Sequence, residues 1–224
     1  FFMQFSINQE KLNRLIVSQL NTFYDDGNTI KESDLLHYQK EAMERIENSF
    51  SQIKLPYYYS NGASIFNHLH GDHYAMYLYL LSNTLYRHNC NIDISSKICS
   101  LNKALHGIDV FYEIELPEIF LFVHPVGTVL GRGKYSDYFV VYQQCTVGAQ
   151  NSLTPRFNGE TVLYSGSSVI GDCVIGKNTI FGANSFVVNT NIKSNKIVLI
   201  SYPNNRIIEN SKSIATTLFN SYTD

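Results

Sequence analysis

Apolar residues recur at every sixth position in two runs of the second half of the chain. The runs comprise Val123, Val129, Tyr135, Val141 and Val147, and then Leu163, Val169, Ile175, Phe181 and Val187. A period of six fits neither the 3.6-residue repeat of an α-helix nor the two-residue repeat of a simple hairpin sheet. It indicates a parallel β-helix of hexapeptide repeats, in which short strands joined by turns stack one residue of each hexad in a shared core.

A small side chain follows most of these positions four residues later, where a turn would crowd the interior. These residues are Gly127, Gly133, Cys145, Ser167, Cys173, Thr179 and Ser185, and Phe139 is the exception. The two runs are separated by 16 residues between Val147 and Leu163, which is ten more than one hexad. The surplus falls in the polar segment GAQNSLTPRFNG, so we expect a loop insertion near residues 148–158.

The first half of the chain has helical periodicity instead. Apolar stripes predict a helix after Ser6, a second over residues 33–54, a third from Asp72 and a fourth from Asp93. Asp72 and Asp93 are expected to cap the last two helices, and Gly107 is expected to end the fourth. The sequence therefore predicts a helical domain followed by a β-helix.

Composition limits the classes of partner. The 224 residues carry a net charge of −2, which leaves no basic surface for nucleic acid. No apolar run approaches the roughly 20 residues of a membrane span, and no signal-peptide pattern opens the chain. The four cysteines, Cys90, Cys99, Cys145 and Cys173, form no C-x-x-C pair. We expect a reducing, cytoplasmic setting without nucleic-acid binding or membrane insertion.

Two residues with catalytic chemistry lie fifteen positions apart, Asp109 in Ile108-Asp109-Val110 and His124 in VHPVGTVLG. With these motifs, residues 108–206 resemble the serine acetyltransferase branch of the hexapeptide acyltransferases. That family pairs a catalytic Asp in V-D-I-H-P with a catalytic His fifteen residues later in D-H-x-x-G-x-V-x-G. The segments LYSGSSVIGDCVIGKNTIFGANSFVV and SYPNNRII are similar to its later coils and its closing G-x-P-A-R-I-V element.

The resemblance implies an α+β chain with an N-terminal α-helical domain at residues 1–107. A left-handed parallel β-helix of hexapeptide repeats would occupy residues 108–210, and a C-terminal tail residues 211–224. It also implies acetyl-CoA as co-substrate and no metal. Because the flat faces of such coils are usually buried by three-fold association, we expect a homotrimer or a dimer of trimers.

The chemistry of acetyl transfer gives an independent reason for a histidine. A hydroxyl must lose its proton as it attacks the thioester, and a neutral imidazole is well suited to accept that proton near pH 7. His124 is predicted to be this base. Asp109, about one coil below, is predicted to hold the other ring nitrogen.

The resemblance also places acetyl-CoA along the edge of the coils. Contacts are expected from small residues and from basic residues that meet its phosphates. The predicted coenzyme-binding residues are Gly148, Ser165, Ala183, Lys193, Lys196 and Arg206.

Two departures from the family bear on the acceptor. The family's D-H is Val123-His124 here, and its R-H-P element is Leu153-Thr154-Pro155. Groups that would pair with the charges of L-serine are thereby lost, and buried charges without partners are unfavourable. A sugar or sugar-nucleotide is the preferred acceptor, with L-serine as the other possibility. The predicted acceptor-binding residues are His70, Asp72, His73, Thr154 and Arg156.

The segment HLHGDH supports a rival hypothesis, because it fits the H-x-H-x-D-H signature of metallo-β-lactamase-type zinc hydrolases. Such enzymes place the motif after an apolar strand and follow it with glycines, whereas the helical YAMYLYLLSNTLY follows here. The ligands would be His68, His70, Asp72, His73 and His124. A γ-carbonic-anhydrase-type site needs several histidines on the coils, and after Gly107 the chain has only His124. A non-catalytic trimeric scaffold is a further alternative.

Overall fold

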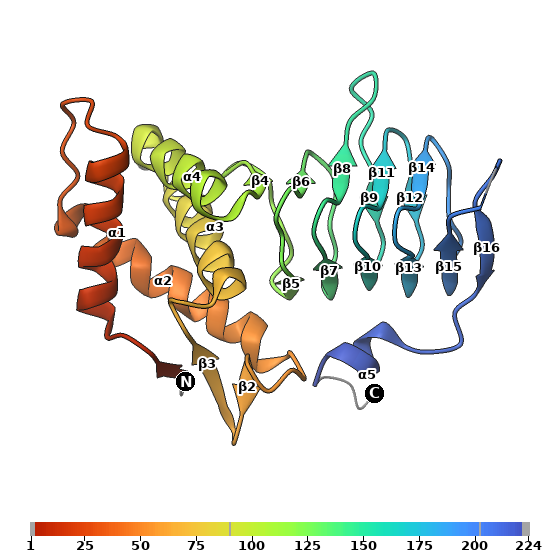
Figure 1. The fold of residues 1–224 in the computed structure, drawn as a ribbon, viewed down its shortest axis with the longest axis horizontal. Coiled ribbons are helices and arrows are strands. Elements are labelled where there is room, and N and C mark those ends of the chain that lie inside the picture. The colour runs from red at the N-terminus through yellow and green to blue at the C-terminus, as the bar shows by residue number, and fades with distance from the viewer. Residues whose placement is uncertain (1–2, 90, 202, 221–224) are drawn as a thin grey trace.

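Helices occupy one end of the molecule and stacked strands the other, as the computed structural model shows (Figure 1). It describes residues 3–89, 91–201 and 203–220. Cys90, Tyr202 of the predicted closing element, and residues 1–2 and 221–224 of the predicted domain and tail lie outside the described residues. The elements of the helical part are α1 (Gln9–Phe23), α2 (Glu32–Ser51), α3 (Gly71–Arg87), α4 (Ile92–His106) and the small sheet of β1 (Met3–Phe5), β2 (Tyr59–Ser60) and β3 (Ala63–Phe66).

Helix α3 is the centre of the helical part, because all fourteen residues from Asp72 to Leu85 are buried. It contacts α2, α4 and the strand β5 (Phe120–Phe122) of the second half of the chain. The four helices follow the predicted periodicity, and Gly107 ends α4 in the left-handed conformation at φ 67°, as expected. None of the helices in the described part of the chain is long and apolar enough to cross a membrane.

The predicted caps of α3 and α4 are each wrong by two positions. His70 is the N-cap of α3, and Asn91 is that of α4, where its side chain accepts a hydrogen bond from the main-chain N–H of Asp93. Asp72 lies inside the first turn of α3, and its carboxylate is directed to another part of the chain. The acidic residues are therefore within the turn that favours negative charge without being caps.

The second half of the chain is a parallel solenoid with three sheets, which confirms the β-helix predicted from the six-residue period. Only β16 runs antiparallel within the solenoid sheets described, against β15. The first sheet contains β4 (Asp109–Val110), β6 (Val129–Leu130), β8 (Thr146–Gly148), β11 (Ser168–Ile170) and β14 (Phe186–Val188). The second contains β5 (Phe120–Phe122), β7 (Phe139–Val141), β10 (Thr161–Leu163), β13 (Thr179–Phe181), β15 (Lys196–Leu199) and β16 (Arg206–Glu209), and the third β9 (Arg156–Phe157) and β12 (Val174–Ile175).

The hexad register holds in the second run and shifts in the first. All five positions of the second run, Leu163 to Val187, are buried at 3 % exposure or less. In the first run Val129 is 42 % exposed and Val123 is half-buried, while Phe122 and Leu130 take the core positions. Phe122 is in register with Val141 of the next coil, and Leu130 with Val147.

A longer corner causes this shift. Six residues, 123–128, connect β5 to β6, whereas four residues, 142–145, make the equivalent connection from β7 to β8. Hydrogen bonds to the next coil bracket the additional residues: Val123 N donates to the Val141 carbonyl at 2.9 Å, and the Val126 carbonyl accepts from Gln144 N at 2.9 Å. The two residues between these contacts, His124 and Pro125, are therefore the additional ones. We call residues 123–128 the His124 corner.

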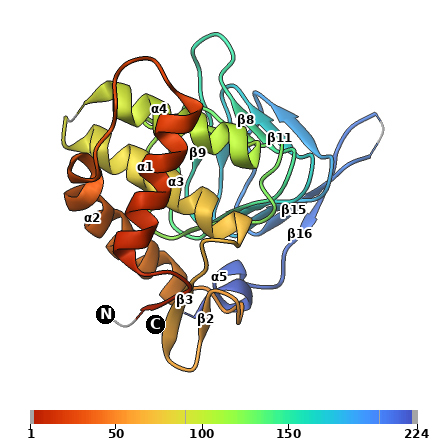
Figure 2. The same cartoon turned by 60° about the vertical axis from the view of Figure 1, so that its left-hand side comes forward.

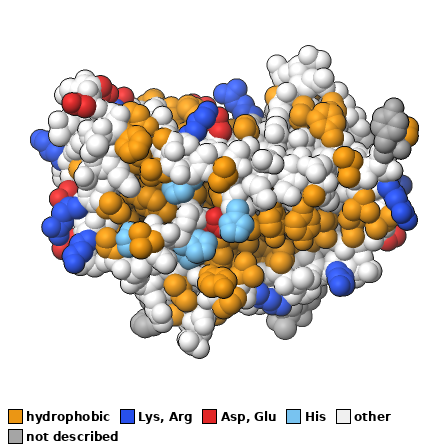
Figure 3. Space-filling model, in the orientation of Figure 1, with side chains coloured by type: hydrophobic (Ala, Val, Ile, Leu, Met, Phe, Trp, Pro, Cys, Tyr) orange, Lys and Arg blue, Asp and Glu red, His pale blue; other side chains and the backbone are white. Residues whose placement is uncertain are grey.

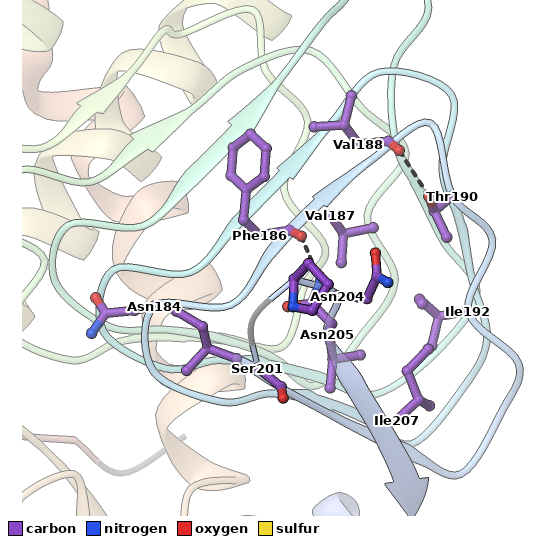
Figure 4. A pocket seen from close by; sticks show the side chains of 13 residues that line it. Asn184, Phe186, Val187, Val188, Thr190, Ile192, Ser201, Asn204, Asn205 and Ile207 are labelled. Carbon is purple, nitrogen blue, oxygen red and sulfur yellow. Dashed lines mark hydrogen bonds between the residues drawn. The ribbon is translucent and has the colours of Figure 1, made fainter.

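The solenoid has a projecting loop and an open end. Residues 149–155 between β8 and β9 form the predicted insertion, which extends beyond the strands (Figure 1). At the C-terminal end, a hollow of about 560 Å³ is lined by the core residues Val187, Ile192 and Val198 and by Asn205 of the β15–β16 connection (Figure 4). Asn205 Nδ2 donates to the Phe186 carbonyl at 2.6 Å. The hollow is therefore the open end of the apolar core.

After β16 the chain returns to the helical part. Helix α5 (Ile214–Leu218) lies beside β2 and β3 in two views (Figures 1 and 2). Phe219 is fully buried, forms an antiparallel bridge with Ile53 and packs its ring against Tyr138 at 4.9 Å between centroids. Lys54 N donates to the Leu218 carbonyl at 2.9 Å. The C-terminal segment thus ties the far end of the solenoid to the helices.

Removal of the Phe219 ring should test this tie. We expect Phe219→Ala to lower the free energy of unfolding by about 3 kcal/mol, because a fully buried aromatic side chain is lost and a cavity remains. Phe23→Ala is the control: Phe23 is 52 % exposed, so its loss should change stability by no more than about 0.5 kcal/mol. Urea denaturation measures both, and equal values for the two variants would contradict a structural role for the C-terminal segment.

Candidate active site

The His124 corner projects its histidine out of the solenoid. The His124 side chain is 77 % exposed, and its backbone lies in the left-handed region at φ 48°. This conformation is unfavourable for a residue with a side chain and persists where surrounding contacts impose it. The contact here is a hydrogen bond from His124 N to Asp72 Oδ1 at 3.1 Å. A residue of helix α3 therefore holds the main chain of the corner.

Asp72 also faces the imidazole. Its Oδ2 lies 3.9 Å from His124 Nδ1, and its side chain is only 8 % exposed. The Tyr58 hydroxyl donates to Asp72 Oδ2 at 3.5 Å. Burial, and then the negative charge of Asp72, raise the pKa of Tyr58 well above its ordinary value, so Tyr58 stays a neutral donor. The helical part thus brings a buried carboxylate and a phenol to the exposed histidine.

Asp109 is placed differently from the expectation that it contacts the other ring nitrogen of His124. Its Oδ2 forms an ion pair with Lys103 Nζ at 2.6 Å, and its side chain is 40 % exposed. Strand β4 is paired with β6 so that Asp109 lies opposite Val129, five residues beyond the histidine. Among the described residues, the carboxylate in contact with His124 is Asp72. A catalytic role for Asp109 stays a prediction from the resemblance.

Further histidines surround the start of α3. Figure 3 shows histidine side chains gathered around an acidic one near the middle of this face, next to apolar surface of the solenoid. The rings of His70 and His73 stack at 4.1 Å, and His73 Nδ1 accepts from Asn67 N at 3.2 Å. Burial, reinforced by His70, lowers the pKa of His73 to about 3. His73 is therefore neutral at physiological pH.

His106, the last residue of α4, is a second neutral histidine near Asp72. Its Cδ2 lies against the first turn of α3, 3.9 Å from the place that a β-carbon would take if Gly71 carried a side chain. Burial lowers its pKa, although the charge of Asp72 acts in the opposite direction. His106 Nδ1 is hydrogen-bonded to Asn102 Oδ1 at 2.9 Å. Its ring is thereby fixed in orientation.

The geometry does not favour the zinc hydrolase. His68 Nδ1 is 2.8 Å from Ser6 Oγ, and His73 Nδ1 accepts a main-chain hydrogen bond, so these nitrogens have separate partners. In the part of the chain that the structure describes, no three His, Cys, Asp or Glu side chains are grouped to hold a metal ion.

Two of the predicted coenzyme-binding residues lie on the same side of the solenoid as the His124 corner, in the column formed by the equivalent corners of successive coils. Gln143, Ser165 and Ala183 succeed one another along the corners of consecutive coils, where Gly166 N donates to the Gln143 carbonyl at 3.0 Å and Asn184 N to the Ser165 carbonyl at 2.8 Å. The Tyr142 and Tyr164 rings lie beside this column, 4.9 Å apart. Ser165 and Ala183, the two small residues of this column, therefore follow one another along the solenoid beside an aromatic pair.

The other predicted coenzyme-binding residues are dispersed. Gly148 ends β8 at the opposite corner of the first sheet, and Lys193 follows the Ile192 bridge to the third sheet. Lys196 forms an ion pair with Glu209, and Arg206 lies opposite Leu199 at the end of the second sheet. The structure does not bring these four together with Ser165 and Ala183 in one cluster.

The predicted acceptor-binding residues fall into two groups. His70, Asp72 and His73 lie at the start of α3 beside the His124 corner. Thr154 lies in the loop insertion, and Arg156 begins β9, where its Nη2 contacts Asp172 Oδ1 at 2.8 Å. The first group therefore lies on a helix beside the His124 corner, and the second lies at the β8–β9 connection of the solenoid.

Tyr58 and His106 were not identified from the sequence. Tyr58 lies in the irregular segment between α2 and β2, where no periodicity marks it. His106 directly precedes the Gly107 stop and lies three residues before Asp109. The signal that could have identified His106 is its position at the junction between the helical part and the first coil.

Comparison with known proteins supports the resemblance. No family model matches the chain. The serine acetyltransferase of Staphylococcus xylosus is 23 % identical over 122 residues, which cover 52 % of this chain and 56 % of that protein. The serine acetyltransferase of Synechococcus elongatus is 25 % identical over 119 residues, 51 % of this chain and 48 % of that protein. The match thus spans about half the length of these curated relatives.

Solved structures extend the likeness to the fold. Serine acetyltransferase isoform 3 of Entamoeba histolytica, in complex with cysteine, superposes with a TM-score of 0.61 at 24 % identity over 89 % of this chain and 73 % of that one. A serine acetyltransferase complex with CoA gives 0.63 at 15 % identity over 79 % and 73 %. The predicted fold, a helical region followed by a left-handed β-helix, is confirmed by this likeness.

Burial of neutral His73 predicts a pH dependence of stability. The folded-state pKa, about 3, lies below the ordinary value of 6.5, so protonation favours the unfolded chain. The contribution is complete above pH 6.5 and is lost as the pH falls toward 3. We expect the free energy of unfolding to drop by about 2 kcal/mol from this residue between pH 7 and pH 5.

Urea denaturation at the two pH values measures this drop. His73→Gln, which retains an acceptor for Asn67 N, should remove most of it. His37→Gln is the control, because His37 is an exposed residue of α2 and should leave the wild-type pH dependence intact. A His73→Gln variant with the full wild-type drop would show that another group is responsible.

Proposed function

We propose that this protein is an acetyl-CoA-dependent O-acetyltransferase with His124 as its general base. The observation that carries the proposal is the His124 corner itself. Its two additional residues expose an imidazole beside a buried carboxylate, on the line of corners that continues through Ser165 and Ala183. The likeness to serine acetyltransferases, one of them solved with CoA, supports the same chemistry.

The proposed reaction follows from the position of His124. The neutral imidazole accepts the proton of the acceptor hydroxyl while that oxygen forms a bond to the thioester carbonyl carbon. The carbon–sulfur bond then breaks, and the leaving sulfur takes the proton from the imidazolium. The products are an acetyl ester and coenzyme A with a free thiol. No metal is required by this scheme.

For the acceptor, we favour a neutral hydroxyl compound of the sugar or sugar-nucleotide class over L-serine. Val123 stands where the resembled family has an acidic residue, and its side chain is half-buried. Burial lowers the pKa of both His73 and His106, so neither ring supplies a positive charge for a carboxylate. The rings of Tyr142 and Tyr164 beside the corner provide surface on which a sugar can stack.

We also propose a homotrimer in a reducing, cytoplasmic setting. The outer face of the first sheet exposes apolar side chains, with Val129 42 % and Phe186 58 % exposed. Association of three solenoids would cover such faces. It would also bring the loop insertion of one copy toward the corner of another, which a single chain does not do. The thiols of Cys99, Cys145 and Cys173 are free, which accords with a reducing compartment.

An acceptor screen tests the function. Acetyl-CoA with the correct acceptor should release free thiol, and we expect sugars or sugar-nucleotides to exceed L-serine in kcat/KM. His124→Ala should reduce kcat at least about a hundredfold, because the base is removed.

The control for this screen is His37→Ala, which removes an exposed histidine of α2 and should retain wild-type turnover. Near-wild-type turnover of His124→Ala would contradict its role as base. Loss of activity on chelation, together with stoichiometric bound zinc, would support the hydrolase instead.

The trimer has a separate test. Sedimentation equilibrium should give three times the chain mass, or six times for a doubled trimer. Phe186→Lys should shift the distribution to monomers, because it puts a charge on the face that association buries. A monomeric wild-type protein at micromolar concentration would contradict the trimer.

A further inference from the structure

We propose that Asp72 of helix α3, and not Asp109 of the solenoid, is the carboxylate that positions the His124 imidazole for proton abstraction. The inference rests on the proposed acetyl transfer and assigns a positioning residue to that site. It departs from the pairing that the sequence resemblance implies.

The first reason is that one carboxylate faces both the main chain and the ring of His124. Asp72 Oδ1 accepts the His124 N–H at 3.1 Å, and Oδ2 stands 3.9 Å from Nδ1. The ring distance exceeds a hydrogen bond, but catalytic hydrogen bonds are often long before substrate binds. The imidazole is 77 % exposed, so solvent and not packed side chains surrounds most of the ring.

The second reason is the different environments of the two carboxylates. Asp72 is 8 % exposed, and the Tyr58 hydroxyl approaches the same Oδ2 at 3.5 Å. Asp109 is 40 % exposed and is engaged by Lys103 at 2.6 Å. A buried charge acts on a neighbouring imidazole with less screening by solvent than an exposed one that is already paired with a lysine.

The third reason is rigidity. A positioning residue must itself be fixed by its surroundings. Asp72 begins the run of fourteen buried residues of α3, and the first turn of a helix favours a carboxylate. Lys103 and Asp109 form an exposed ion pair at the surface. The helical domain therefore supplies the better-fixed partner.

This arrangement determines which ring nitrogen carries the proton. With Asp72 beside Nδ1, the hydrogen resides on Nδ1, and Nε2 is left with the lone pair that accepts the hydroxyl proton. The carboxylate then stabilises the imidazolium formed during the reaction.

Steady-state kinetics of charge-removing variants test the inference. Asp72→Asn keeps an oxygen for the His124 N–H but removes the charge beside Nδ1. We expect kcat to fall about 10²- to 10⁴-fold, the range seen when an orienting carboxylate is neutralised, with KM for acetyl-CoA changed less than about twofold. The fall in kcat of Asp109→Asn should be at least about tenfold smaller than that of Asp72→Asn.

The matched control is Asp137→Asn. Asp137 Oδ1 accepts a main-chain hydrogen bond from Ile119 N at 3.0 Å on another part of the solenoid, so this variant reproduces the loss of charge at a backbone contact without approaching His124. Wild-type kcat is expected. A greater loss in Asp109→Asn than in Asp72→Asn would overturn the inference.

A second measurement does not depend on turnover. The ¹⁵N shifts of the His124 ring, in protein labelled at histidine, report the tautomer. We expect Nδ1–H in the wild type and in Asp109→Asn, and a shift toward Nε2–H in Asp72→Asn. An unchanged tautomer in Asp72→Asn would overturn the inference. If the wild type acetylates no acceptor, the proposed function fails, and the tautomer alone decides whether Asp72 positions His124.

Discussion

The register of the stacked coils is the constraint on which the rest of the structure depends. Each coil must return its core residue above that of the coil before it, as Leu163 does with Val141 and Phe181. A corner with additional residues must place them without moving the strands on either side, which are held in register. Of the two additional residues at the His124 corner, Pro125 is buried and His124 is exposed, so the histidine is the one that the corner presents to solvent. The regular register of the strands thus makes the longer His124 corner stand out from the equivalent corner of the next coil.

The helical part completes what the solenoid lacks. An exposed histidine in a left-handed backbone conformation has no fixed orientation by itself, and the contact that holds it comes from Asp72, 52 residues earlier in the chain. Ser49 and Phe120 join the two parts a second time, through a hydrogen bond from Ser49 Oγ to the Phe120 carbonyl at 2.8 Å. The C-terminal segment adds a third connection through Phe219. His124 and the carboxylate of Asp72 thus belong to different parts of the chain, whose relative position is fixed at several points.

The sequence predicts those features that are encoded by local period and spacing. The second hexad run was predicted in full, since Val169, Ile175 and Phe181 are buried as expected. His124 was identified, but Val123 and Val129 were assigned to the core because a uniform period cannot show that one corner is longer. The contact from Asp72 joins a helix turn to a distant coil, and no periodic signal carries such a contact. HLHGDH matches a metal signature through residue types, whereas in the fold His68 Nδ1 contacts Ser6 Oγ and His73 Nδ1 accepts a hydrogen bond from Asn67 N.

Burial of the residues around Asp72 bears on the acceptor that we propose. His73 and His106 are held neutral by desolvation, and Tyr58 keeps its proton for the same reason and because a carboxylate is beside it. A carboxylate acceptor would need a cation here, and converting either histidine to one would oppose the burial that lowers its pKa. A neutral hydroxyl compound needs no such cation. Discrimination against charged acceptors would then follow from the same packing that holds α3 against the solenoid.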